Sequence, residues 1–401
     1  MPSLCFYFQV HQPFRLKPYD CFKIGEDHAY EDEQKNREIL DRVAAKCYLP
    51  ANDTLLNLIE KYQGKFKIAY SLSGTVIEQM ERYRPDVLES FQALAKSGCV
   101  EFLSETYYHS LSFLYSKEEF VRQVGMHKQK IEEVFSQSPQ VFRNTELIYN
   151  NEIANFVSDL GYKGIICEGL EHVLGYKSPN FLYHPPKNEN IVSLLKNYKL
   201  SDDIAFRFSN KEWAEWPLTA PKFAKWIHQI AGNGETINLF MDYETFGEHQ
   251  WPETGIFDFL ESLPNEIYKH PDFNFKTPSE VIKTYQAPGE YDVHHLSSWA
   301  DLERDLSAWL GNSLQHDAME RIYSLEKKVK ETGDLHLLDN WAKLLTSDHF
   351  YYMSTKYWND GDVHKYFSHY NTPYDAYINF MNVVTDLEHV LEVNYEKIVV
   401  S

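Results

Sequence analysis

Seven short apolar runs, rich in β-branched and aromatic residues, recur along the first 250 residues of the chain. Runs of about four to eight such residues are typical of buried strands. The predicted strands are 4–10, 66–72, 100–103, 141–144, 164–167, 204–208 and 237–241. Most of the intervening segments have helical spacing, and strands that alternate with helices predict a parallel sheet built from βα units. We interpret 179–200, which contains Pro185-Pro186, as a long loop.

The hydrophobic pattern changes near residue 287. Three long stretches with apolar residues three and four positions apart follow, at 299–332, 335–358 and 375–398. This spacing predicts helices. A chain of 401 residues also exceeds the usual size of one small domain. We therefore expect two domains: a β/α barrel over 1–287, and an α-helical bundle over 288–401 that contributes to the cleft.

Polar residues follow the carboxyl ends of all seven predicted strands. They are His11, Ser71 and Ser73, Glu105, Glu146, Glu168, Arg207 and Asp242. In a parallel β/α barrel, the active site is built from several such strand ends. Any one of these acids could instead be a solvated loop residue, but their repetition favours a site.

The last strand gives the strongest signal. It is followed within ten residues by Asp242, Glu244, Glu248, His249 and Trp251. Ionised groups are costly at the end of a core strand unless they are paired, solvated or used. This density of charge beside an aromatic ring indicates a site for a polar substrate.

Composition narrows the class of substrate. The formal net charge of −20 argues against nucleic acid as a partner, because a phosphate backbone is bound by concentrated Lys and Arg. Aromatic residues make up 15% of the chain, which suits stacking on sugar rings as well as core packing. Neutral or cationic substrates therefore fit best.

The sequence contains no recognisable pattern for secretion, membrane insertion or cofactor binding. The first ten residues lack the basic region and cleavage site of a signal peptide, and no apolar stretch approaches the roughly 18 residues of a membrane span. The five cysteines show no CxxC spacing, which argues against a disulfide framework and a structural zinc site. We expect a cytoplasmic protein that has no membrane partner and no cofactor.

Five ordered motifs bring in a family resemblance. They are His11-Gln12-Pro13, 98–103 (Gly-Cys-Val-Glu-Phe-Leu), Thr145-Glu146, 241–247 (Met-Asp-Tyr-Glu-Thr-Phe-Gly) and 298–312, which ends in Ser-Ala-Trp-Leu-Gly-Asn. Together they resemble the five characteristic regions of glycoside hydrolase family 57, in its α-amylase-type subgroup. The resemblance implies an incomplete, TIM-like (β/α)7 barrel followed by a helical domain.

The same resemblance implies a chemistry. Family members act on α-glucans with retention of configuration, and the motif positions make Glu146 the nucleophile and Asp242 the acid/base. A retaining glycosidase needs two such carboxyl groups, one ionised and one carrying a proton. An α-glucan or maltooligosaccharide is the expected substrate, with no metal; the sequence does not indicate an oligomeric state.

Further residues are expected to contact the substrate. The resemblance implies His11, Glu101, Glu244, Asp305 and Trp309, while proximity to the acids suggests Tyr107, His109, Phe246 and Trp251. Four alternatives stay open. His11 could be a core histidine that hydrogen-bonds a backbone carbonyl. Glu101 could belong to the barrel wall, Trp309 could be a core residue, and Asp301 could replace Asp305 at the sugar.

Four other activities remain possible from the sequence. On the same fold, a 4-α-glucanotransferase or a branching enzyme differs only in what attacks the glycosyl-enzyme. A metal-dependent carbohydrate hydrolase could use Asp242, His249, His294 and His295, although no tight ligand motif is present. A non-catalytic glucan-binding protein is disfavoured by the presence of both Glu146 and Asp242.

Overall fold

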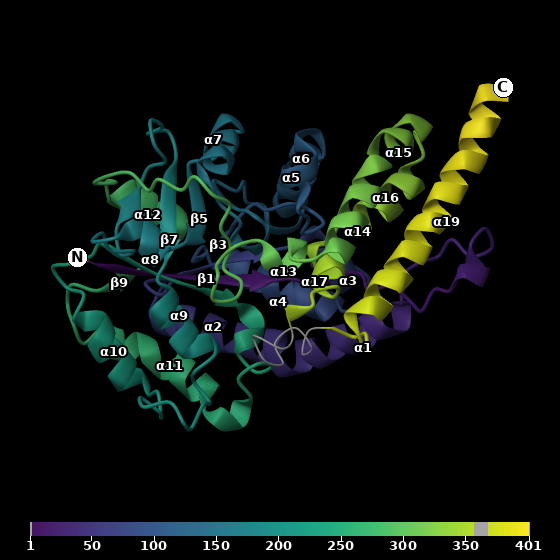
Figure 1. Cartoon of the computed structure of the whole chain (residues 1–401). Helices are drawn as coiled ribbons and strands as arrows, with labels where there is room; N and C mark the ends of the chain where they lie inside the picture. Colours follow the sequence, from purple (N-terminus) through teal and green to yellow (C-terminus); the bar gives the residue numbers. More distant parts are fainter. Residues whose placement is uncertain (1, 357–367, 401) are drawn as a thin grey trace.

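Seven parallel strands form the centre of the protein in a computed structural model that describes residues 2–356 and 368–400 (Figure 1). The strands are β1 (Ser3–Val10), β2 (Ile68–Leu72), β3 (Val100–Phe102), β4 (Val141–Arg143), β5 (Gly164–Glu168), β7 (Val192–Lys196) and β8 (Thr236–Asp242). Their order in space is β3-β2-β1-β8-β7-β5-β4. All carboxyl ends therefore point the same way.

The ring of strands closes through sparse pairing. Ser104, just after β3, forms a parallel backbone bridge with Phe142 of β4. On the opposite side, β7 and β8 share one register pair, Lys196 with Asn238. With seven strands instead of the eight of a TIM barrel, this is the predicted incomplete (β/α)7 barrel, and the fold class is confirmed. Two short strands add to it: β6 (Leu182–Tyr183) beside β7 and β9 (Asn274–Phe275) beside β1.

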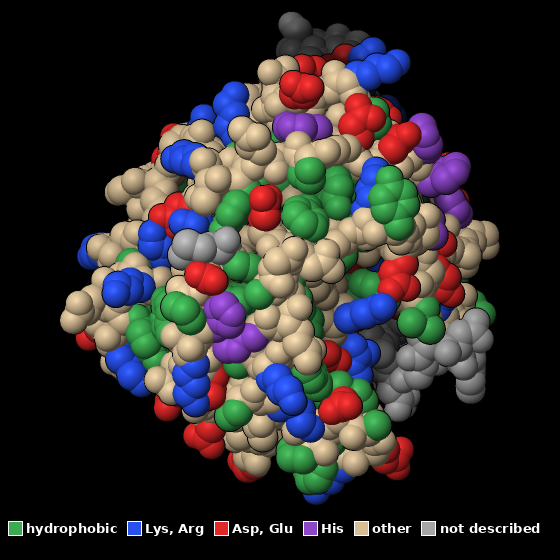
Figure 2. Space-filling model, turned by 90° about the vertical axis from the view of Figure 1, so that its left-hand side faces the viewer, with side chains coloured by type: hydrophobic (Ala, Val, Ile, Leu, Met, Phe, Trp, Pro, Cys, Tyr) green, Lys and Arg blue, Asp and Glu red, His purple; other side chains and the backbone are tan. Residues whose placement is uncertain are grey.

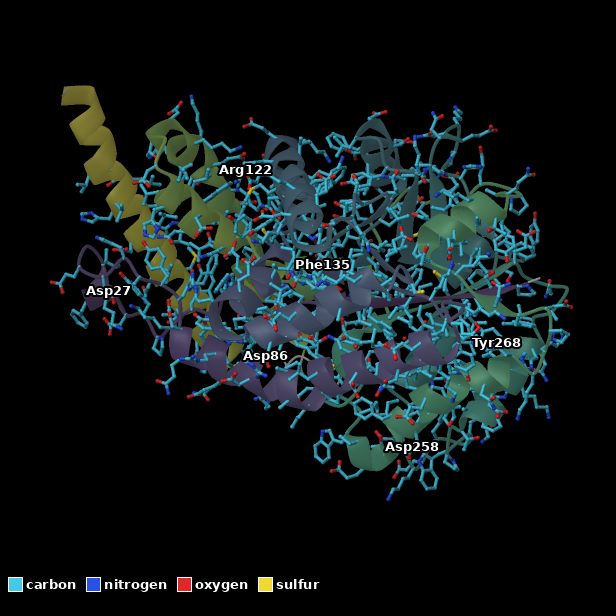
Figure 3. The ribbon with its side chains drawn as sticks, turned by 180° about the vertical axis from the view of Figure 1, so that it is seen from behind. Asp27, Asp86, Arg122, Phe135, Asp258 and Tyr268 are labelled. Atoms are coloured by element: carbon cyan, nitrogen blue, oxygen red, sulfur yellow. The ribbon has the colours of Figure 1, made fainter. Side chains whose placement is uncertain are left out.

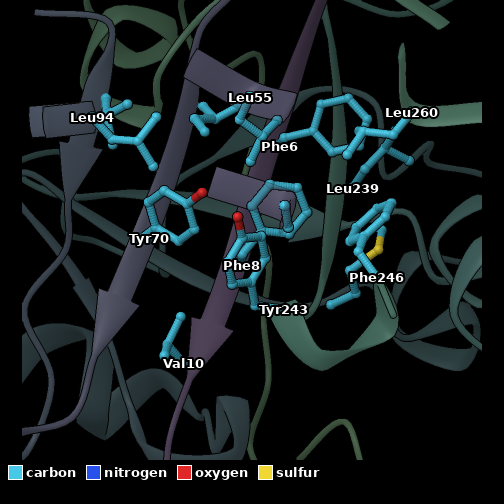
Figure 4. Packing of buried hydrophobic residues seen from close by; sticks show 14 of the residues in the cluster. Phe6, Phe8, Val10, Leu55, Tyr70, Leu94, Leu239, Tyr243, Phe246 and Leu260 are labelled. Carbon is cyan, nitrogen blue, oxygen red and sulfur yellow. The ribbon is translucent and has the colours of Figure 1, made fainter. Parts of the chain in front are cut away.

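Both faces of the strands are buried, as expected for a parallel barrel. In β1, Cys5 and Tyr7 belong to the cluster that fills the barrel, while Phe6 and Phe8 pack with the surrounding helices (Figure 4). This alternation follows from the period of two along a strand. It explains why the strands appear in the sequence as continuous apolar runs.

Helices surround the barrel. The α-helices before residue 287 are α1 (Glu33–Val43), α2 (Leu49–Lys61), α3 (Gly74–Tyr83), α4 (Pro85–Lys96), α5 (Ser112–Tyr115), α6 (Lys117–Phe135), α7 (Asn151–Asp159), α8 (Glu171–Leu174), α9 (Tyr198–Ala205), α10 (Ala220–His228), α11 (Ile256–Ile267) and α12 (Pro278–Thr284). Shorter or wider turns are η1 (Cys21–Lys23), η2 (Ala44–Tyr48), η3 (Thr145–Leu147), η4 (Tyr243–Thr245) and η5 (Pro252–Thr254). Two of these turns, η3 and η4, directly follow β4 and β8.

A helical region lies at one side of the barrel and carries the C-terminus (Figure 1). It comprises α13 (Ser307–Leu310), α14 (Ser313–Ser324), α15 (Glu326–Thr332), α16 (Leu335–Lys343), α17 (Ser347–Tyr351) and α19 (Pro373–Val400). Arg321 of α14 pairs with Glu388 of α19, and Tyr377 donates a hydrogen bond to Asp317 across 2.6 Å. Lys330 of α15 pairs with Glu118 of α6 at 2.8 Å, and α19 lies at the far left in the view from behind (Figure 3).

The segment between the barrel and the helices follows the barrel. Ser297 forms an antiparallel bridge with Tyr149, and Glu290 forms a parallel bridge with His184. A single hydrophobic cluster also joins Phe142 and Ile165 of the barrel to Trp341 of α16. The division at residue 287 stays a prediction.

The expected strand at 204–208 is wrong. Residues 198–205 form α9, which Asn197 caps by accepting a hydrogen bond from the backbone N–H of Leu200 across 3.2 Å. The barrel strand that we did not predict is β7, which lies inside the stretch that we interpreted as a loop. A helix cap directly after a short apolar run is the signal that the sequence offered here.

The predicted long helices are shorter than expected, except the last. The stretch 299–332 becomes helical only at Ser307, because Asp301 and Arg304 adopt positive φ angles that interrupt a right-handed helix. The stretch 335–358 contains α16 and α17, and its end lies outside the described residues. The helix predicted at 375–398 is confirmed by α19.

The surface carries mixed charges. On the face shown in Figure 2, Lys and Arg side chains are scattered among acidic ones rather than gathered in one patch. Within 2–356 and 368–400, no helix combines the length and the apolar content needed to cross a bilayer.

Candidate active site

A cavity of about 690 Å³ lies at the carboxyl ends of the barrel strands. Its walls come from strand ends, from the segment after the barrel and from α17. The lining residues include His11, His109, Glu146, Lys196, Phe206, Asp242, Glu244, Glu248, His249, Trp251, Trp299, Asp301, Trp309, Asp348 and Tyr351. The size and the few convergent polar groups suit a small-molecule or oligosaccharide site.

Glu146 is held by three donors at the end of β4. It lies in η3 with a φ of 58°, a left-handed conformation that is uncommon outside glycine. The indole Nε1 of Trp299 donates to Oε2 across 2.9 Å, and the hydroxyl of Ser347 donates to Oε1 across 3.1 Å. His109 Nε2 lies 3.3 Å from Oε1. These contacts fix the carboxyl group at the cavity wall.

The same surroundings favour the ionised form of Glu146. Burial alone would raise the pKa of this carboxyl, but the hydrogen bond and positive charge of His109, together with Arg143, lower the pKa below its usual value. Glu146 is therefore an anion at neutral pH.

Asp242 has the opposite tendency. It ends β8, directly beside Gln9 of β1 in the parallel register. Burial, followed by the negative charge of Glu146, raises the pKa of Asp242 to about 6. A raised pKa next to an ionised carboxylate is the electrostatic arrangement that lets one of two acids keep a proton.

Glu244 is a second proton-bearing carboxyl. The hydroxyl of Tyr48 donates to its Oε1, and burial, followed by the charge of Asp242, raises the pKa of Glu244 to about 8. At neutral pH this group is largely a neutral acid. It can therefore donate a hydrogen bond into the cavity.

His109 links Glu146 to a buried acid. Its Nδ1 lies 2.7 Å from Oε2 of Glu105, which is 0% exposed. Burial would lower the pKa of His109, but the hydrogen bond and charge of Glu105 raise it to about 9. His109 lies at the cavity wall as a cation, whereas Glu105 lies behind it.

His11 connects the barrel to the helical region. Its Nδ1 lies 2.7 Å from the hydroxyl of Ser73, and its Nε2 lies 2.9 Å from Oδ2 of Asp348 in α17. The ring stacks on His109 with centroids 3.9 Å apart. Burial and the charge of His109 lower the pKa of His11, so the stacked pair carries one positive charge.

A buried ion cluster holds the segment after the barrel in place. Lys196, at the end of β7, pairs with Asp202 at 3.1 Å and with Glu168 at 3.5 Å. Arg304 pairs with the same two acids, at 3.2 Å from Asp202 and 3.6 Å from Glu168. Arg304 belongs to the same segment as Trp299. The ion cluster therefore also positions the Trp299 indole, which donates a hydrogen bond to Glu146.

Exposed aromatic side chains line part of the cavity. Phe206 is 65% exposed and Trp251 is 62% exposed, and both belong to the lining. The flat apolar faces of these two rings suit the C–H faces of sugars.

Most residues predicted for the site line the cavity. They are His11, His109, Glu146, Asp242, Glu244, Trp251 and Trp309. Trp309 is also buried and packs against Tyr351. It is therefore both a core residue and a residue of the cavity lining. Between the two acids of the fifth region, Asp301 lies in the lining and pairs with Lys356 at 3.1 Å.

Two predicted acids lie elsewhere. Glu101 accepts a hydrogen bond from the backbone N–H of Ser279 across 2.9 Å and so holds the first turn of α12, beside β9 at the start of β1. This is the barrel-wall alternative. Asp305 is exposed and accepts the backbone N–H of Ser307 across 2.8 Å, at the start of α13. Neither lines the cavity.

Two predicted aromatics are packing residues. Tyr107 lies against Gly74, where a Cβ atom would come within 2.5 Å of the ring, and its hydroxyl donates to Glu78 across 2.7 Å. Phe246 is buried edge-on to Phe8, with centroids 5.5 Å apart (Figure 4). Both are absent from the cavity lining.

Sequence reasoning missed several residues of the site. Trp299 stands in the fifth motif region, but Trp309 and Asp305 were chosen there instead. Lys196 was hidden in the unrecognised strand β7. Ser347 and Asp348 belong to a segment for which spacing predicted one continuous helix. A helix start at Ser347 instead places Asp348 in the cavity lining and the Ser347 hydroxyl against Glu146.

The described residues do not bring together the ligands that the metal-dependent alternative would need. Among the residues that the structure describes, no three His, Cys, Asp or Glu side chains are placed to hold one ion. His294 is exposed and pairs with Asp292 at 3.2 Å, away from the cavity lining.

Comparison with known proteins places the chain in a family. A barrel of this kind, with carboxyl groups of lowered and of raised pKa in one cavity, has the groups that glycoside hydrolysis requires. Residues 5–294 match the model of "Glycosyl hydrolase family 57". The chain belongs to this family, and the protein is a glycoside hydrolase.

Named relatives agree with the family. A protein of Methanocaldococcus jannaschii called "Putative alpha-amylase" is 45% identical over 97% of this chain and 85% of its own length. An "Alpha-amylase" of Pyrococcus horikoshii is 23% identical over 82% of this chain. The match spans 47% of that relative, so this chain covers less than half of its length.

Solved structures share the fold. The branching enzyme of family 57 from Pyrococcus horikoshii superposes with a TM-score of 0.64 at 16% identity, covering 91% of this chain and 87% of that one. The α-amylase AmyC from Thermotoga maritima gives a TM-score of 0.59 at 13% identity, covering 99% and 93%. At such identities the likeness establishes the architecture alone.

Proposed function

We propose that the protein hydrolyses α-1,4-glucosidic bonds with retention of configuration, with Glu146 as nucleophile and Asp242 as acid/base. The observation that carries this proposal is the placement of Glu146, just after β4, and Asp242, at the end of β8, in the lining of one cavity, where their surroundings shift their pKa values in opposite directions. The pKa of Glu146 is lowered by His109, whereas that of Asp242 is raised to about 6. A retaining glycosidase needs one anion and one acid in these states.

In the first step, the Glu146 carboxylate attacks the anomeric carbon of the bound glucose unit. The bond from that carbon to the glycosidic oxygen breaks, and this oxygen takes the proton of Asp242. The products are a glycosyl ester on Glu146, an ionised Asp242 and a shortened glucan with a free hydroxyl. The donors Trp299 and Ser347 hold the attacking carboxylate in place.

In the second step, ionised Asp242 removes a proton from water while the water oxygen attacks the anomeric carbon. The ester bond breaks and its electron pair returns to Glu146, which is again an anion. Two inversions leave the product with the configuration of the substrate. Asp242 regains its proton, so both carboxyl groups end in their starting states.

The substrate class rests on the family and on the cavity. Proteins named α-amylase are similar to this chain over most of its length. Exposed Phe206 and Trp251 offer flat apolar faces at the cavity. A net charge of −20 suits a neutral polysaccharide better than an anionic one.

Azide rescue of two glycine variants tests the roles of the carboxyl groups. With an activated aryl α-maltoside, Glu146→Gly should be inactive until azide is added, and the product should be the β-glycosyl azide, formed by a single inversion. Asp242→Gly should give the α-glycosyl azide, because Glu146 still forms the first ester. Glu119→Gln, a buried change on α6, is the matched control and should keep full activity.

The configuration of the azides decides the outcome. An α-azide from Glu146→Gly, or normal hydrolysis by that variant, would assign the nucleophile elsewhere. A separate chromatogram of products from maltoheptaose distinguishes hydrolysis from transfer. Shorter sugars alone mean hydrolysis, longer α-1,4 products mean a 4-α-glucanotransferase, and α-1,6-linked products mean branching.

A further inference from the structure

We propose that Glu105 is a positioning residue of the reaction: from behind the cavity wall it holds the imidazolium of His109 against the Glu146 carboxylate. Glu105 does not line the cavity, so it acts through His109 and does not touch the sugar. This inference rests on the proposed role of Glu146 as nucleophile.

The geometry requires a protonated His109. Its Nδ1 lies 2.7 Å from Oε2 of Glu105, and its Nε2 lies 3.3 Å from Oε1 of Glu146. Ionised carboxylates only accept hydrogen bonds, and a neutral imidazole has one donor nitrogen. Only the imidazolium can donate to both acids at once. The three side chains therefore form a line in which an anion, a cation and an anion alternate.

The backbone fixes the ring in this line. His109 adopts a φ of 52°, in the left-handed region, and its N–H donates to the carbonyl of Thr106 across 3.0 Å. Its own carbonyl accepts the N–H of Ser347 across 2.9 Å. A turn in this conformation four residues after Glu105 brings the ring back over that carboxylate.

Glu105 is anchored as a permanent anion. Its Oε1 accepts the hydroxyl of Ser71 and the amide of Gln9, the latter across 3.2 Å, and its Oε2 lies 3.9 Å from Nη1 of Arg143. Burial opposes its charge, but His109 and then Arg143 outweigh burial, and the pKa of Glu105 is lowered. A fully buried carboxylate with this many partners is fixed in position.

The contacts of the other titratable groups near His109 indicate that only one of the neighbouring histidines carries a positive charge. From the end of β1, His11 stacks on the ring and is itself paired with Asp348 of α17. From α6, His127 accepts the backbone N–H of Glu105 through Nδ1 across 3.3 Å, and its Nε2 lies 2.7 Å from the carbonyl of Leu72, so it is neutral. Arg143 on β4 and Asp242 on β8 complete the set. The cationic ring is thus His109 rather than His11 or His127.

The arrangement matters when the glycosyl ester breaks. At that moment negative charge returns to Glu146, and the imidazolium already lies 3.3 Å away to receive it. With a neutral amide in place of Glu105, the buried His109 loses the anion that keeps it charged. Glu146 then loses its nearest positive charge, which should hinder turnover more than substrate binding.

Steady-state kinetics of Glu105→Gln against pH test the proposal. We expect kcat to fall by about tenfold or more while KM changes by less than about threefold, as for a group that acts in the transition state. The acid limb of kcat/KM should move to higher pH by at least about half a unit, since a neutral His109 no longer favours the Glu146 anion. Glu119→Gln removes an equally buried and paired carboxylate outside the site and should change neither value.

A second measurement reads the protonation state of His109 in the wild-type protein. In ¹⁵N-histidine NMR spectra of the wild-type protein, both ring nitrogens of His109 should carry protons well above pH 7. His109→Gln assigns the signal by its loss. Titration of His109 near its ordinary range of about 6.5 would overturn the proposal, as would an unchanged pH profile and kcat in a folded Glu105→Gln.

The two proposals fail in different ways. If Glu146→Gln hydrolysed maltoheptaose like the wild type, the role of Glu146 would be wrong, whatever the state of His109. If Glu146→Gln were inactive while Glu105→Gln behaved as the wild type, only the role of Glu105 would be wrong.

Discussion

Trp299 donates its indole N–H to Oε2 of Glu146 across 2.9 Å and so joins the segment after the barrel to the end of β4. The backbone N–H of Trp299 also donates to the carbonyl of Glu146 across 3.2 Å. Two cations flank the ring, with Arg143 at 5.0 Å and Lys196 at 5.7 Å from its centroid. The indole is thereby held in one orientation, and the Glu146 carboxylate with it.

Trp299→Phe should separate this hydrogen bond from the packing of the ring. Phenylalanine keeps an aromatic face between the two cations but has no donor for Glu146. We expect kcat to fall by about tenfold, in line with the loss of one hydrogen bond to a charged group, and the melting temperature to change little. Trp226→Phe on α10, outside the cavity lining, is the control, and equal kcat losses in both variants would contradict the assigned role.

The pH dependence of kcat/KM should be bell-shaped with a mildly acidic optimum. Activity requires ionised Glu146, whose pKa is lowered from 4.5, and protonated Asp242, whose pKa is raised to about 6. The rate should rise with pH as Glu146 loses its proton and fall above about 6 as Asp242 loses its own. A rate that stays constant from pH 6 to pH 9 would contradict this assignment of the acid.

Trp251→Ala should affect long substrates more than short ones. The side chain is 62% exposed at the cavity, so truncation removes stacking area without opening the core. We expect KM for maltoheptaose to rise by about threefold to tenfold, as the loss of one stacked ring of about 0.5–1.5 kcal/mol implies, with a smaller change for maltotriose. Equal effects on both sugars would mean that Trp251 does not contact the far part of the chain.

Glu101→Gln should lower stability and leave activity intact. Its carboxylate accepts hydrogen bonds from the backbone and hydroxyl of Ser279 at the start of α12, and it does not line the cavity. Weakening these bonds should cost about 1–3 kcal/mol in urea unfolding, while kcat/KM stays within about twofold. A large loss of kcat/KM in a stably folded variant would return Glu101 to the substrate site.

The barrel could be predicted because its strands are buried on both faces. Runs such as that of β1 are apolar without interruption from Leu4 to Phe8, and polar residues follow each strand at one edge of the sheet. β7 escaped notice because it lies in the stretch that we interpreted as a loop and because it ends in Lys196. Lysine is rarely buried, and only its pairing with Glu168 and Asp202 makes that position possible.

The site was predictable where a motif residue directly follows a strand. Glu146 lies in the turn after β4 and Asp242 ends β8, so sequence position alone places them at the cavity. Contacts from distant segments could not be inferred in this way. Asp348 reaches His11 across 337 positions, and Ser347 reaches Glu146 across 201, through packing that periodicity does not encode.

Trapping of the glycosyl-enzyme tests the central claim most directly. A 5-fluoro-α-glucosyl or α-maltosyl fluoride forms the ester but slows its hydrolysis, because the fluorine disfavours the positive charge of the transition state. After brief incubation and peptic digestion, mass spectrometry should find one added fluorosugar on the peptide that contains Glu146, and none in Glu146→Gln. A label on another carboxylate, or rapid turnover with no label on the wild type, would contradict the account.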